Sequence, residues 1–210
     1  IANIRENHSV DVVFAINEYT ITATAGAEGQ IVMPGANTVT YGQNINFTIR
    51  ATEHCYHIDN ILVDGNVDTT FTNNEVLYVY TFNNVTADHT IEAQFATRTY
   101  TVTATATGNG TVDPEGTATL NCGDDATYTF TPDEGYEIAS VTVNGQNMGV
   151  LESYTILDIQ NDYTIDVVFE QLTYTVTATA FNHGTIDPMG DTTVAYGSTV
   201  NYTLTPEECY

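Results

Sequence analysis

The sequence predicts an all-β chain built from small tandem repeats, and three observations support this fold class. The motif YTVTATA stands at 100–106 and again at 174–180, and the near copy YTITATA stands at 19–25. Short stretches of alternating apolar and polar residues follow each copy, as is typical of half-buried strands. Gly and Pro separate these stretches, and none carries a sustained helical period. We therefore expect small β-sandwich or β-grasp-like repeats arranged end to end.

The repeat length follows from the extent of the match between copies. The segments that begin at Tyr100 and Tyr174 keep glycines and a proline in register, and their starting points differ by 74 residues. The copy that begins at Tyr19 precedes the second copy by 81 residues and contains small insertions. The repeats are thus about 74–81 residues long.

Closing segments recur as well, and they set the domain organisation. The strand-like segment at 7–20 resembles those at 87–101 and 161–175. We therefore expect the chain to be a window on a longer array. Its parts are the tail of an upstream repeat (1–18), a first β-repeat (19–98), a second β-repeat (99–172) and the head of a downstream repeat (173–210).

The strands of a repeat can be assigned from the second copy. In 100–106, the Tyr, Val and Ala side chains share one face, and the threonines share the other face. The pair Asn144-Gly145 predicts a tight hairpin turn. Further strands are expected at 126–131, 138–143, 153–157 and 163–169.

Three longer motifs resemble a known family. They are YTVTATATGNGTVDPEG at 100–116, TFTPDEGYEIASVTVNG at 129–145 and YTFNNVTADHTIEAQF at 80–95. They are similar to the divergent InlB B-repeat domains, and with the partial copies the resemblance covers essentially the whole chain. It implies a bacterial secreted or surface protein whose repeats act as stalks, spacers or adhesive modules. It brings no catalytic residues.

The charge balance excludes two classes of partner. The chain has 3 basic and 27 acidic residues, a net charge of −24, and all three basic residues are arginines. Nucleic acid and anionic membrane surfaces require clustered Lys and Arg, so neither is expected as a partner. The sequence contains no run of about 18 consecutive apolar residues, so membrane insertion of this segment is not expected.

The residues that carry chemistry in other proteins form no recognisable site here. The segment EHCYH at 53–57 resembles a ligand cluster, but strand alternation would place His54 and His57 on opposite faces. The carboxylates cluster beside Gly and Pro in turns, which is a structural pattern. No Gly-x-Ser-x-Gly motif or EF-hand spacing is present. We therefore predict no enzyme and no catalytic, cofactor-binding or metal-binding residues, with calcium as an open alternative.

The three cysteines occupy two positions of the repeat. Cys122 stands where other copies have tyrosine, and Cys55 and Cys209 stand where the second repeat has Gly135. Neither whole repeat has cysteine at both of these positions, so a disulfide within one repeat is excluded. Two alternatives stay open, namely thiols or an inter-repeat or intermolecular disulfide formed in an oxidising environment.

Two threonines are candidates for modification. Thr69 and Thr192 follow Asp68 and Asp191, and this Asp-Thr pair resembles an O-glycosylation motif of some bacteria rich in surface proteins. Both threonines are therefore predicted as O-glycosylation sites.

The function predicted from these observations is an extracellular or cell-surface structural module, which is a stalk, adhesin or fibre segment. Its partners would be neighbouring repeats, other copies in a fibre, or a host or cell-surface ligand. The alternatives are a glycan- or protein-binding module with tyrosine-rich faces, and accessory repeats of a larger secreted enzyme.

The connections between repeats are short. Segments 95–101 and 169–175 leave no flexible linker, so we expect restricted motion between repeats, with each junction stiffened by Tyr100 or Tyr174.

Overall fold

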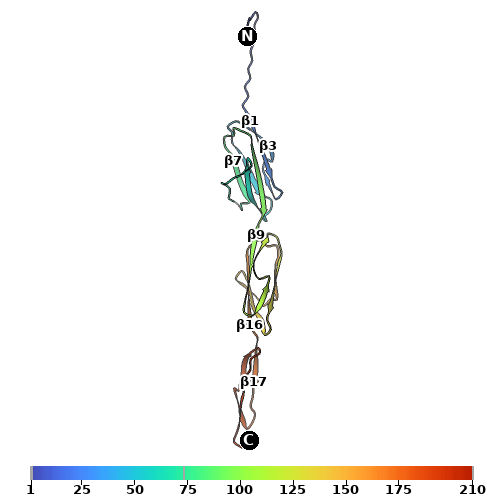
Figure 1. Cartoon of the computed structure of the whole chain (residues 1–210), viewed down its shortest axis with the longest axis vertical. Coiled ribbons are helices and arrows are strands. Elements are labelled where there is room, and N and C mark those ends of the chain that lie inside the picture. The colour runs from blue at the N-terminus through green and yellow to red at the C-terminus, as the bar shows by residue number, and fades with distance from the viewer. Residues whose placement is uncertain (1, 73, 210) are drawn as a thin grey trace. The chain divides into compact units, whose positions relative to one another are not determined.

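The computed structural model describes residues 2–72 and 74–209. The chain divides into two compact units, Ile1–Arg98 and Thr99–Tyr210 (Figure 1). Every regular element in the described ranges is a β-strand, which confirms the all-β prediction. These ranges contain no helix with the length and apolar character of a membrane span.

The first repeat is a sandwich of two sheets. One sheet has the strand order β3-β1-β8-β5-β6, and the other has the order β2-β4-β7. β1 and β8 pair in parallel, and the other paired strands are antiparallel. The strands are β1 (Glu18–Ala25), β2 (Gly29–Ile31), β3 (Gly35–Thr40), β4 (Ile45–Ala51), β5 (Tyr56–Val63), β6 (Asn66–Val67), β7 (Leu77–Phe82) and β8 (His89–Thr97).

The second repeat has the same topology. Its sheets have the orders β11-β9-β16-β13-β14 and β10-β12-β15, with β9 and β16 side by side in parallel (Figure 1). The strands are β9 (Thr99–Thr107), β10 (Gly110–Asp113), β11 (Gly116–Asn121), β12 (Ala126–Pro132), β13 (Tyr136–Val143), β14 (Gln146–Gly149), β15 (Ser153–Ile156) and β16 (Tyr163–Gln171). The expected strands of this repeat are confirmed.

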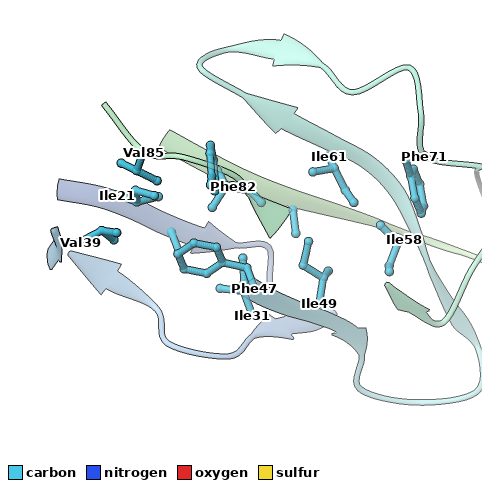
Figure 2. Close-up of a cluster of buried hydrophobic side chains, with 13 residues drawn as sticks. Ile21, Ile31, Val39, Phe47, Ile49, Ile58, Ile61, Phe71, Phe82 and Val85 are labelled. Carbon is cyan, nitrogen blue, oxygen red and sulfur yellow. The ribbon is translucent and has the colours of Figure 1, made fainter. Parts of the chain in front are cut away.

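Each core lies between the five-stranded and the three-stranded sheet. In the first repeat, Ile21 from β1 and Ile61 from β5 face Phe47 from β4 and Phe82 from β7 (Figure 2). Phe47 is fully buried, and its ring meets that of Phe82 edge-on at a centroid distance of 6.0 Å. The second layer is also a sheet, so each repeat has the sandwich-like architecture that the sequence predicted.

The predicted hairpin turn joins β13 to β14. Asn144 and Gly145 have φ angles of 48° and 78°, and positive φ at both central residues is the pattern of a type I′ turn. In the first repeat, Asp64 and Gly65 turn in the same way, with φ angles of 51° and 77°.

The partial copies are less regular. The head contains two strand pairs, β17 (Thr173–Ala178) with β19 (Gly190–Ala195), and β18 (Gly184–Asp187) with β20 (Thr203–Pro206). The described tail, 2–17, is exposed and contains no strand, contrary to its strand-like pattern. Its counterpart β16 is paired on both sides, by β9 and by β13, and the described residues 2–17 hold no equivalent of either partner.

Candidate functional site: the junction between repeats

A single residue connects the second repeat to the head. Leu172 stands between the end of β16 and the start of β17. Its N–H donates to the carbonyl oxygen of Gly135 at 2.8 Å, and its own carbonyl accepts from the N–H of Tyr196 at 2.8 Å. The linker backbone is therefore hydrogen-bonded to the repeat before it and to the head after it, which restrains both of its torsions.

The same two hydrogen bonds recur at the equivalent positions of the first unit. Arg98 is the one residue between β8 and β9, and its N–H donates to the carbonyl oxygen of Cys55 at 2.8 Å. Asn17 directly precedes β1, and its carbonyl accepts from the N–H of Tyr41 at 2.8 Å. The linker hydrogen bonds therefore form at equivalent positions even though the linker residue differs from repeat to repeat.

Side chains complete the junction in the second unit. Gly135 has φ +82°, and a Cβ placed on it would lie 2.3 Å from Cδ1 of Tyr196, so the tyrosine ring packs directly on the glycine backbone. The Tyr196 hydroxyl donates to Oε1 of Glu134 at 2.7 Å. This hydrogen bond raises the pKa of Tyr196, since it stabilises the protonated phenol, and burial contributes less. Tyr196 thus contacts the repeat before the linker, and the expected stiffening role of Tyr174, which is 53% exposed, stays a prediction.

One type of turn recurs at three places, and in two of them it holds the tyrosine, Tyr41 or Tyr196, whose N–H donates to the residue before strand β1 or β17. Residues 40–43, 121–124 and 195–198 each close with a hydrogen bond from the fourth N–H to the first carbonyl, at 3.0 Å. The third residue is glycine each time because its φ is positive, as in a type II turn. These glycines are Gly42 at 82°, Gly123 at 89° and Gly197 at 72°. The second residue of the turn is Tyr41, Cys122 or Tyr196.

Replacing Gly135 by alanine is expected to loosen this junction. The new Cβ would displace the Tyr196 ring and break its hydrogen bond to Glu134. We expect the amides of Leu172 and Tyr196 to exchange about tenfold faster, which corresponds to about 1.4 kcal/mol of local stability. Gly149→Ala is the matched control, since Gly149 has the same φ of +82° and a Cβ built on it would have no atom within 4 Å. Equal exchange rates in the two variants would contradict the role of the Tyr196 ring.

The predicted cysteines differ in state. Cys55 and Cys122 are disulfide-bonded. Cys209 is a free, exposed thiol whose φ of 78° matches the left-handed conformation of Gly135. The cysteines therefore fall on the two repeat positions that flank a linker residue.

The two predicted O-glycosylation sites lie in different environments. Thr69 is exposed, beside an Asp68 carboxylate that accepts from the N–H and the hydroxyl of Thr70 at 2.9 and 2.7 Å. Thr192 is half-buried within β19, where it pairs with Val176. Neither lies near a linker, and their modification stays a prediction, with Thr69 the more accessible of the two.

His54 and His57, which the sequence predicted not to form a metal site, lie near Arg98, the linker residue that follows the first repeat. His54 is exposed in a turn and His57 lies in β5. Burial lowers the pKa of His57, and the Arg98 charge lowers it further against the opposing effect of Asp59. A lowered pKa keeps this imidazole neutral at pH 7.

Comparison with known proteins agrees with the repeat architecture. No curated protein matches the chain. The family model of the divergent InlB B-repeat domain matches residues 100–172, from the second residue of β9 to the linker residue Leu172. This family is a non-catalytic repeat that is typical of bacterial surface and secreted proteins. The second repeat of this chain is therefore a divergent InlB B-repeat domain.

Proposed function

We propose that the chain is a structural segment of an extracellular or cell-surface array, such as a stalk, adhesin or fibre, with no catalysis of its own. The observation that carries this proposal is the one-residue linker, whose N–H and C=O are both engaged at Leu172. A module that transmits position or force needs junctions of restricted motion, and a linker without free torsions provides them. Neighbouring repeats would then keep a restricted mutual orientation.

Two further features support this role outside the cell. Cys55 and Cys122 are disulfide-bonded, and disulfides persist chiefly in oxidising environments. The net charge of −24 favours solubility and keeps separate chains apart in dilute salt. Both features fit the typical setting of the family to which the second repeat belongs.

The arrangement of tyrosines favours a spacer over a glycan-binding module. A glycan-binding face would need exposed rings that are free of other contacts, but two of the three exposed tyrosines of the described residues, Tyr41, Tyr174 and Tyr196, are engaged within the chain. Tyr41 packs against Tyr19 at a ring-centroid distance of 6.4 Å, and Tyr196 bonds to Glu134. The positions of Tyr41 and Tyr196 are equivalent and belong to the junction end of the repeat.

Small-angle scattering on the 210-residue chain tests the proposal. One variant carries Gly-Ser-Gly-Ser between Gln171 and Leu172, and the control carries the same insert between Val150 and Leu151, in the loop between β14 and β15. We expect the linker insert to broaden the distribution of interatomic distances and the loop insert to leave it unchanged. A wild-type chain that scatters like the linker variant would overturn the proposal, because its repeats would already move freely.

A further inference from the structure

A groove in the second repeat opens between β12, β13 and the loop that leads from β14 to β15. Its volume is about 450 Å³, within the roughly 300–1,000 Å³ that is common for ligand pockets. Phe130 from β12 and Ile138 from β13 line its buried side, and Val150, which is 66% exposed, lies at its rim. We call this feature the β12–β13 groove.

The first repeat covers the equivalent place with a side chain of its own. Phe71, in the loop between β6 and β7, is 8% exposed and lies at the Ile58 end of the core (Figure 2). Its ring meets that of Tyr78 edge-on at a centroid distance of 5.0 Å. The loop backbone is held there as well, because the carbonyl of Glu75 accepts from the N–H of Ile58 at 2.8 Å.

The second repeat lacks this cover because its loop is shorter. The first loop spans 68–76, between β6 and β7, whereas the second spans only 150–152, between β14 and β15, and contains no aromatic residue. Ile138 is the counterpart of Ile58, because the pairing of β13 and of β5 shifts directly after these residues. Ile58 is 0% exposed and Ile138 is 8% exposed. The groove is therefore open at the place that Phe71 closes in the first repeat.

Strand pairing identifies the residue that replaces Tyr78. Ile49 lies opposite Tyr78 in the first repeat. Its counterpart Phe130 donates its N–H to the carbonyl of Glu152 at 2.9 Å, so the aromatic ring of the first repeat is replaced by a carboxylate in the second. Glu137 from β13 also lines the groove, and both glutamates are exposed. The β12–β13 groove thus combines an apolar base with an acidic rim.

This combination determines the chemistry of a fitting occupant. An aromatic side chain would cover the apolar base, as the ring of Phe71 does in the first repeat. The carboxylates at the rim attract Lys and Arg and disfavour acidic partners. A second copy of the chain fits poorly, because its basic residues are three arginines and its net charge is −24. The occupant is therefore expected to be a basic segment of a different protein.

We propose that the β12–β13 groove binds an extended segment of a partner protein that carries one aromatic residue flanked by Lys or Arg. The aromatic side chain packs over Phe130 and Ile138, and the basic side chains pair with Glu137 and Glu152. The second repeat would then bind protein in addition to its structural role. The proposal does not depend on the linkers, so its failure would leave the proposed function intact.

Nuclear magnetic resonance of the isotope-labelled 210-residue chain tests the proposal, with the end-capped peptide Lys-Thr-Thr-Phe-Thr-Lys as the probe. The four middle residues of this peptide copy 69–72, and its lysines supply the positive charge. We expect saturable shifts at the amides of Ile138, Val150 and Glu152. A matched peptide with Ala in place of Phe should bind about tenfold more weakly, because burial of the ring is lost.

Two double variants separate the groove from general attraction to an acidic chain. Glu137→Gln with Glu152→Gln should weaken binding of the Phe peptide severalfold. Glu115→Gln with Glu170→Gln makes the same change of charge at exposed residues outside the groove lining, and should leave binding unchanged.

A third variant closes the groove from within. Insertion of Thr-Phe-Thr-Asn-Asn-Glu, the sequence of 70–75, between Gly149 and Val150 gives the second repeat the longer loop of the first. We expect this variant to lose binding of the Phe peptide while its circular dichroism spectrum stays that of a folded β-protein.

Four outcomes would overturn the proposal. They are no shift of the groove amides at millimolar peptide, equal binding of the Phe and Ala peptides, equal losses in the two double variants, and groove amides that shift with chain concentration alone. The last outcome would assign the groove to a second copy of the chain.

Discussion

Replacing Gly108 by alanine is expected to destabilise the second repeat by about 3 kcal/mol, through two separate costs. Gly108 has φ +93°, a left-handed conformation that costs an L-residue roughly 1–2 kcal/mol. A Cβ at this position would also lie 2.2 Å from the carbonyl oxygen of Phe169. That neighbour is backbone of β16, so β9 or β16 must shift, at a further cost of roughly 1–3 kcal/mol.

Gly116→Ala separates the two costs. Gly116 has φ +86° and no atom within 4 Å of a built Cβ, so only the left-handed penalty of roughly 1–2 kcal/mol applies. Hydrogen exchange of peptides from β9 and β16 in the intact chain reports the loss in the second repeat alone. A domain of this size loses about 4–8 °C of melting temperature per kcal/mol, so the two variants are readily distinguished. Equal losses would show that β9 and β16 do not approach as closely as the structure has them.

The strands and hairpin turns were predictable because their signals are local. The alternation of Val102 and Ala104 with threonines set the buried face of β9, and both side chains are fully buried. Asn144-Gly145 marked the turn because positive φ at two successive residues demands such a pair. The parallel pairing of β9 with β16 was not predictable, since Tyr163 pairs with Val102 across the whole repeat and no local pattern encodes that register.

The junction was predictable in location but not in its contacts. The short segment 169–175 indicated a tight connection, but closeness in sequence pointed only to Tyr174 and gave no sign of the contact made by Tyr196. Tyr196 reaches Glu134, 62 residues away, only after both turns have formed.

Acidification from pH 7 to pH 4 is expected to convert dispersed chains into large assemblies. The net charge of −24 at pH 7 falls towards zero near the sequence pI of about 4.1, and electrostatic repulsion between chains falls with it. Apolar side chains then become free to associate. The head exposes several of them, including Phe181 at 86% and Leu204 at 71% exposure.

The folded repeats should persist through this transition, so that association precedes unfolding. The N–H and hydroxyl of Thr101 donate to Asp162 and lower the pKa of that carboxyl, which opposes protonation at the start of β9. A depressed carboxyl pKa contributes stability that is present above the unfolded value of 3.8 and is lost only as the pH falls below it.

Light scattering at low salt, with circular dichroism on the same samples, separates association from unfolding. At pH 7, added salt should produce part of the same rise, because the screening length is only about 8 Å at physiological ionic strength. Scattering that stays flat down to pH 4, or that rises only once the β-sheet signal is lost, would show that surface charge does not keep the folded chains apart.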